Sequence, residues 1–134
     1  MNVALILGGS LAIVGAAVHG LGGELLVVRK LSAATLPHSR FGGPGATKRM
    51  IHATWHMTTI AFVAVGCAML VAGSALHGDT RRGLAILAAG ASTGFAALAV
   101  GMGATAPGFR RSLLRHPAPA MLTATAVLAW LGAL

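Results

Sequence analysis

The sequence IHATWHMTTIAFVAVGCAMLVAGSAL, residues 51–76, decides the fold class because it is long, apolar and free of acidic and strongly basic side chains. About 17 to 25 such residues in a helix cross the hydrocarbon core of a bilayer. Three further stretches are also long and apolar, at residues 3–28, 84–102 and 117–134, and Glu24 is the single acidic residue among them. None shows the period-two alternation of a barrel strand, and backbone groups in lipid must pair within their own segment, so each stretch is predicted to be a helix.

The composition agrees with a protein dissolved in lipid. Hydrophobic residues make up 56% of the chain and charged residues only 9%, against about 25% charged in soluble domains. The 134 residues suffice for one domain. We therefore expect an all-α fold, a polytopic integral membrane protein whose single four-helix transmembrane bundle covers residues 1–134. No cationic n-region precedes residues 3–28, so this stretch is expected to remain as a mature helix.

The cations predict how the bundle is oriented. Of the ten Lys and Arg residues, all but Arg81 and Arg82 fall in residues 29–50 and 103–116. The positive-inside rule makes these two connections cytoplasmic and places the protein in the cell inner (plasma) membrane. Four crossings then put both termini on the non-cytoplasmic side.

The same cations bear on the expected partners. A formal net charge of +8 could attract nucleic acid, but the loops lack the interleaved aromatic side chains that stack bases, so nucleic acid is excluded. Anionic lipid headgroups are the expected partners, each nearby cation contributing about 1 kcal/mol. Trp55 and Trp130 are predicted interface anchors. Because four short helices enclose little volume, we expect a homo-oligomer or a larger membrane complex.

Four ionisable residues inside the apolar stretches are the candidate functional residues: His19, Glu24, His52 and His56. A central charge in a membrane helix costs about 2.5 to 3.5 kcal/mol, so each group needs a partner or a purpose. His52 and His56 share one helix face at i, i+4 spacing. At about 1.5 Å per residue, Glu24 and His56 reach comparable depth. The four side chains are therefore predicted to meet in the cytoplasmic half.

Several chemistries suit this cluster. Imidazole and carboxylate ligands suit zinc, copper or iron, so all four residues are candidate metal ligands. Alternatively, His19 with His52 or His56 ligates a b-type haem between facing helices. In a third hypothesis the cluster exchanges protons, as in a proton-coupled transporter, or binds a quinone or lipid headgroup, since imidazole titrates near physiological pH. In the fourth, it only fixes helix packing in a structural or accessory subunit, without cofactor. The sequence defines no reaction.

Small residues predict where helices approach closely. Spacing of four recurs in Gly8, Ala12, Ala16 and Gly20, and again in Gly90 and Gly94 followed by Gly101. Both stretches are expected to pack tightly against neighbours. The cluster Gly42-Gly43-Pro44-Gly45 is expected to break helix and mark an irregular loop, and GGPGATK lacks the spacing of a phosphate-binding loop.

Two motifs carry a resemblance. HGLGGE (residues 19–24) and WHMTT (residues 55–59) resemble a group of small four-helix bacterial inner-membrane proteins without an assigned activity. The resemblance implies that His19, Gly23, Glu24, Trp55 and His56 form a shared polar set. A histidine followed by Gly-Gly near the end of a first helix is also similar to copper-resistance membrane proteins, which would imply copper handling.

Overall fold

A computed structural model describes residues 1–40, 42–105 and 116–134, and these residues form an all-α structure of four helices. The first is interrupted: α1 (Val3–Ala17) passes through a π-helical segment, η1 (Val18–Gly22), into α2 (Gly23–Leu26). The others are α3 (Pro44–Ser74), α4 (Gly78–Thr105) and α6 (Ala118–Ala133). The predicted all-α class is confirmed.

Three of these helices are long and apolar enough to cross a membrane: Val3–Lys30, Pro44–Ser74 and Gly78–Thr105. They indicate a multi-pass membrane protein. The fourth, α6, is apolar but has 16 residues, about 24 Å at 1.5 Å per residue. That is shorter than a hydrocarbon core of about 30 Å.

Two helices begin earlier than the sequence predicted. α3 begins at Pro44 instead of residue 51, with Gly43 in an extended conformation before it. The Gly42–Gly45 cluster therefore starts a helix, because the fixed φ of proline suits a first helical turn. α4 begins at Gly78 instead of residue 84 and continues to Thr105. The predicted cytoplasmic loop 29–50 thus shortens, and includes two 3-10 turns at Val28–Lys30 and Ala33–Thr35. Of the predicted loop 103–116, residues 106–115 lie outside the described part of the chain.

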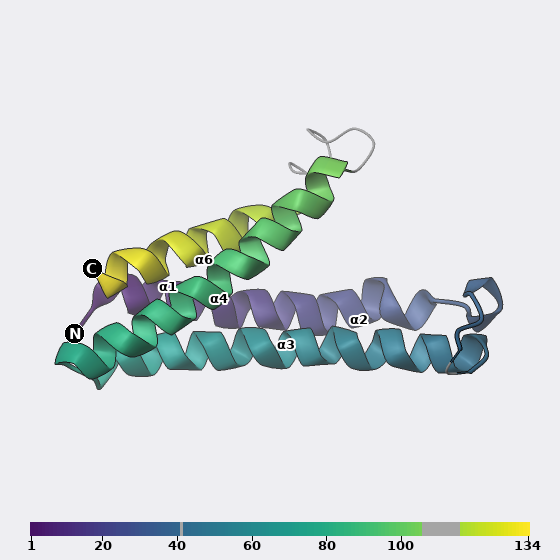
Figure 1. Ribbon diagram of the computed structural model, residues 1–134, viewed down its shortest axis with the longest axis horizontal. Coiled ribbons are helices and arrows are strands. Elements are labelled where there is room, and N and C mark those ends of the chain that lie inside the picture. The colour runs from purple at the N-terminus through teal and green to yellow at the C-terminus, as the bar shows by residue number, and fades with distance from the viewer. Residues whose placement is uncertain (41, 106–115) are drawn as a thin grey trace.

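The helices form two antiparallel pairs (Figure 1). α1 and α2 run alongside α3, and α4 runs alongside α6. The pairs meet at the end that holds both termini and the α3–α4 connection, which we call the terminal end, and α4 and α6 lean away from α3 toward the other end. We call that other end, where α2 is connected to α3, the loop end.

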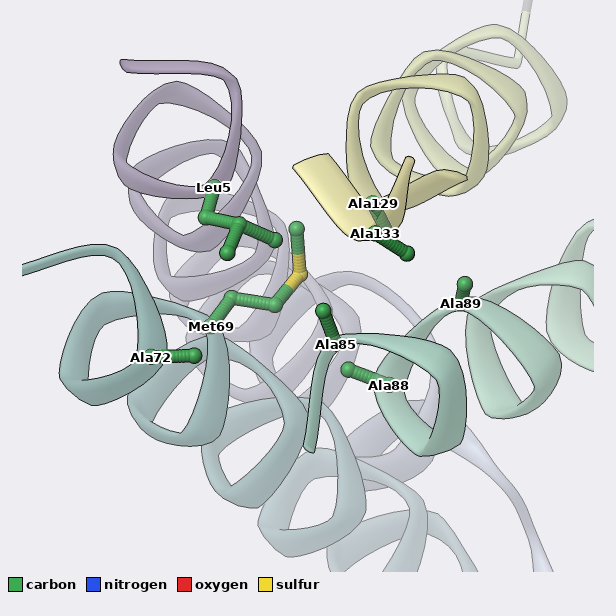
Figure 2. Packing of buried hydrophobic residues seen from close by; sticks show 8 residues of the cluster. All are labelled: Leu5, Met69, Ala72, Ala85, Ala88, Ala89, Ala129 and Ala133. Carbon is green, nitrogen blue, oxygen red and sulfur yellow. The ribbon is translucent and has the colours of Figure 1, made fainter. Parts of the chain in front are cut away.

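The buried core lies at the terminal end and draws on all four helices (Figure 2). Its largest members are Leu5 of α1 and Met69 of α3, both 0% exposed. Alanines supply the rest, so the helices approach closely: Ala72, Ala85, Ala88, Ala89, Ala129 and Ala133. Asn2 joins three chain segments here, because its backbone N–H donates to the Gly73 carbonyl (2.8 Å) and its side-chain amide donates to the Gly132 carbonyl (3.0 Å).

Close packing of α1 depends on glycine, and two members of the predicted small-residue stripe take part: a Cβ on Gly8 would lie 3.0 Å from Leu128 Cβ, and one on Gly20 would lie 2.8 Å from Thr59 Cγ2. The closest backbone approach to α3 uses Gly9 and Gly66, which the stripe did not include. A Cβ on Gly9 would lie 2.8 Å from the Gly66 carbonyl oxygen, and a Cβ on Gly66 would lie 3.0 Å from that of Gly9. The prediction for the second stripe is wrong. Gly90 and Gly94 are exposed, with no described atom within 4 Å of an added Cβ. α4 instead packs through its alanines and Ser92.

Candidate metal centre

Two of the candidate residues come from α3, eight and twelve residues after its first residue, Pro44. His52 and His56 are four residues apart, so they stand on one helix face. Their ring centroids are 4.8 Å apart and the rings are tilted by 58°. Both side chains point across to the first helical segment, where Glu24 lies in the first turn of α2.

Glu24 meets both histidines with a single oxygen. Its Oε2 lies 3.1 Å from Nε2 of His52 and 3.4 Å from Nε2 of His56. The three ligand atoms all lie within 4.8 Å of one another. We call these three residues the Glu-His-His group; the sequence predicted that they would share one depth, and the structure brings them together.

The shared oxygen is buried, yet within the described part of the chain no hydrogen-bond donor meets it at suitable geometry. The distances alone would allow an ion pair with a protonated imidazole, but neither contact is a hydrogen bond to this oxygen. The side chains are partly accessible, 23% for Glu24, 48% for His52 and 43% for His56. An atom that converges with two nitrogens without a hydrogen bond fits a set of lone pairs directed at a cation.

The separations suit a transition metal. Ligand atoms about 2.0 to 2.1 Å from zinc lie roughly 3.3 Å apart in a tetrahedron, a value between the two observed nitrogen–oxygen distances of 3.1 and 3.4 Å. The three ligand atoms together spread over up to 4.8 Å, so a bound ion would draw the two imidazoles closer to each other. Two imidazoles and one carboxylate form a donor set known for zinc, with one position left for water, and for ferrous iron with more open positions. The residues present therefore fit a divalent metal ion.

His19 has different neighbours. Its Nδ1 lies 2.9 Å from the Thr59 hydroxyl, and its ring stacks on Trp55 with centroids 4.5 Å apart and planes 10° apart. The Thr59 hydroxyl also donates to the Trp55 carbonyl at 3.2 Å, and while its single proton is used there, Thr59 can only accept from Nδ1–H of His19. Phe62 contacts the same ring edge-on at 5.3 Å. The structure does not include His19 in the Glu-His-His group.

Trp55 connects the two helices as well as lying near the loop end. Its Nε1 donates to the His19 carbonyl at 3.0 Å, and its ring packs where a Cβ on Gly23 would stand. Sequence reasoning, which predicted an interface anchor, missed this contact. Trp130 is 43% exposed and donates from Nε1 to the Thr93 hydroxyl at 3.0 Å. It links α6 to α4.

The π-helical segment sets the direction of Glu24. An α-helix advances about 100° per residue, and a π turn accommodates an additional residue. Residues after η1 are therefore rotated relative to an uninterrupted helix, which turns Glu24 from the predicted edge of its stripe toward α3. The sequence signal was the glycine-rich HGLGG, residues 19–23, whose low helix propensity permits such a turn.

Two hollows flank the contact between the first helical segment and α3. One, of about 440 Å³, is lined by apolar side chains of α1 and α3 and reaches Glu24 and His56. We call it the α1–α3 groove. The other, of about 520 Å³, is lined by His19 and Trp55 together with threonines. His19 and His56 thus line separate hollows.

Comparison of this chain with protein-family models, with curated proteins and with solved structures finds no match. The candidate chemistry therefore stands on the geometry of the Glu-His-His group and on the apolar helices around it.

Proposed function

We propose that this protein is a four-crossing inner-membrane protein that binds one divalent transition-metal ion, zinc or ferrous iron, at the Glu-His-His group. The observation that carries the proposal is the convergence of Glu24 Oε2 with Nε2 of both histidines, without a hydrogen bond at the buried oxygen. A bound ion supplies a Lewis-acidic centre with an open coordination position. Glu24, His52 and His56 hold it from two helices.

The proposed orientation places this centre near the cytoplasmic face. Lys48 and Arg49 lie within one turn of His52, and Arg29 and Lys30 follow α2. Under the positive-inside rule the loop end is cytoplasmic and both termini face the other side. The metal is then accessible from the headgroup region, in agreement with the partial exposure of both histidines.

The alternative of a b-type haem has less geometric support. A bis-histidine haem needs one imidazole on each side of the porphyrin, whereas His19 and His56 line different hollows. The structural alternative, in which the cluster fixes helix packing, is supported for His19, whose ring and carbonyl are hydrogen-bonded to Thr59 and Trp55 of α3. It is less well supported for the Glu-His-His group, whose shared oxygen has no hydrogen bond in the described part of the chain.

Elemental analysis and an absorption spectrum of protein purified from native membranes test the proposal. We expect close to one zinc or iron per chain and no Soret band. His56→Ala and Glu24→Gln should weaken metal binding by about 100-fold or more, since even residues behind the ligands contribute 10- to 100-fold. His77→Ala is the matched control, because His77 is exposed in the α3–α4 connection.

Metal-free wild-type protein that also fails to take up zinc or ferrous iron on titration would contradict the proposal. A Soret band lost in His56→Ala would favour haem instead. Wild-type protein without metal whose thermal stability falls in His56→Ala would favour the structural alternative.

A further inference from the structure

The α1–α3 groove changes character along its length. Glu24 and His56 form the polar end of the groove, and Ile13 and Val63 form its opposite, apolar end. Residues 13 and 24 are eleven positions apart, about 16 Å along the helix at 1.5 Å per residue. The hollow is thus an open, largely apolar groove that ends at two members of the Glu-His-His group.

The groove faces outward along the flank of the helix pair. Leu21 is 71% exposed, Leu25 55% and Val63 40%, and all three line it. Two small side chains of α1, the buried Ala16 and the exposed Ala17, also line it. In a bilayer these surfaces face acyl chains, so an amphiphile can enter the groove sideways from the membrane.

One face of α3 shows a matching gradient of polarity. Lys48, His52 and His56 follow at spacings of four, and Thr59 and Val63 continue the same face deeper into the helix. A cation and two imidazoles therefore lie above the groove, and apolar side chains lie along it. A molecule that fits this face has a polar head toward the loop end and a hydrocarbon tail toward the helix centre.

The charge at the polar end of the groove, near Glu24 and His56, determines which kind of head group can bind there. Glu24 is the single acidic side chain of the group, so a bound divalent ion leaves a net charge of +1 there, with Lys48 one turn above His52. Tail burial contributes little to selectivity, because lipid tails are as apolar as the groove. The preference must come from the head, and an anionic oxygen donor completes a shell that has an open position.

We propose that the α1–α3 groove binds a single-chain anionic amphiphile of the fatty-acid type, with its carboxylate at the metal and its tail along Ala17 and Val63. This inference rests on the proposed function, since without the metal Glu24 would repel an anionic head. The groove volume of about 440 Å³ lies within the range of about 300 to 1,000 Å³ typical of small-molecule sites.

Binding of the fluorescent polyene cis-parinaric acid to zinc-loaded protein in phosphatidylcholine nanodiscs tests the inference. Palmitate should displace the probe at a concentration at least 10-fold lower than hexadecanol, which has the same tail without the charge. Ala17→Leu places a larger side chain in the lining of the groove and should weaken probe binding by at least 10-fold at unchanged zinc content. Val14→Leu is the matched control, because Val14 is exposed on the same helix but does not line the groove.

The two proposals fail in distinguishable ways. A zinc content near one per chain, with equal competition by palmitate and hexadecanol or with undiminished binding in Ala17→Leu, overturns the fatty-acid assignment alone. A short-chain quinone that competes better than palmitate also overturns it, in favour of a neutral head. Wild-type protein that binds neither zinc nor ferrous iron overturns the proposed function and this inference together.

Discussion

At the terminal end all four helices contribute side chains to one cluster, whereas at the loop end the Glu-His-His group uses only α2 and α3. The first region is small, apolar and closed, with Leu5 and Met69 at 0% exposure. The second is polar and half open, with His52 and His56 above 40% exposed. The contrast separates the residues that hold the bundle together from those available for chemistry.

The largest effect on stability is expected from the terminal end. Leu5→Ala removes the largest fully buried side chain, and buried Leu→Ala changes cost about 2 to 5 kcal/mol through lost contacts and a cavity. Unfolding in detergent micelles measures the loss, and zinc content should stay unchanged. Leu7→Ala is the control, since Leu7 is 55% exposed on the same helix. Equal losses in both variants would contradict the placement of the core.

A smaller effect on stability is expected from substitutions at the contact between α1 and α3. Gly66→Ala would bring a Cβ to 2.8 Å from Ile13 Cδ1 and 3.0 Å from the Gly9 carbonyl oxygen, and such overpacking costs about 1 to 3 kcal/mol. The control is Gly90→Ala, where no described atom lies within 4 Å of the new methyl group. For Gly90→Ala we expect the free energy of unfolding to rise by up to about 1 kcal/mol, because alanine has a higher helix propensity than glycine. Destabilisation by Gly90→Ala would mean that a second copy covers this face.

The sequence could not predict which glycines pack against a neighbouring helix. The apolar run at residues 51–76 sufficed to predict a helix, and the i, i+4 spacing placed His52 and His56 on one face. In lipid, however, outward residues are as apolar as packed ones. Periodicity therefore could not distinguish Gly66, which contacts α1, from Gly90, which faces outward.

The sequence predicted the membrane depth of the candidate site residues, but not the direction in which the Glu24 side chain points. Counting residues placed Glu24 at the same depth as His56, and Oε2 of Glu24 lies 3.4 Å from Nε2 of His56. That Glu24 turns toward α3 depends on the π-helical segment, which a uniform helical period does not contain. For the same reason the contact of His19 with Thr59 and Trp55 was missed. The shared polar set implied by the resemblance, which includes His19 and Trp55, stays a prediction.

The smallest effect is expected next to the Glu-His-His group. Thr59→Val keeps the side-chain shape but removes the hydroxyl that contacts His19 Nδ1 at 2.9 Å. Membrane hydrogen bonds contribute about 0.6 kcal/mol on average, so stability should fall by about that amount and the zinc affinity should not change. If zinc affinity falls at least 10-fold, His19 contributes to metal binding, and the assignment of His19 and the Glu-His-His group to separate hollows is incorrect.

X-ray absorption at the zinc edge of the loaded protein tests the central claim most directly, because it counts the imidazoles on the metal. We predict two imidazole nitrogens at about 2.0 to 2.1 Å, with oxygen ligands completing the shell. His77→Ala should leave the spectrum unchanged and His52→Ala should reduce the imidazole count to one. A shell without imidazole, or one with three imidazoles that includes His19, would contradict the account.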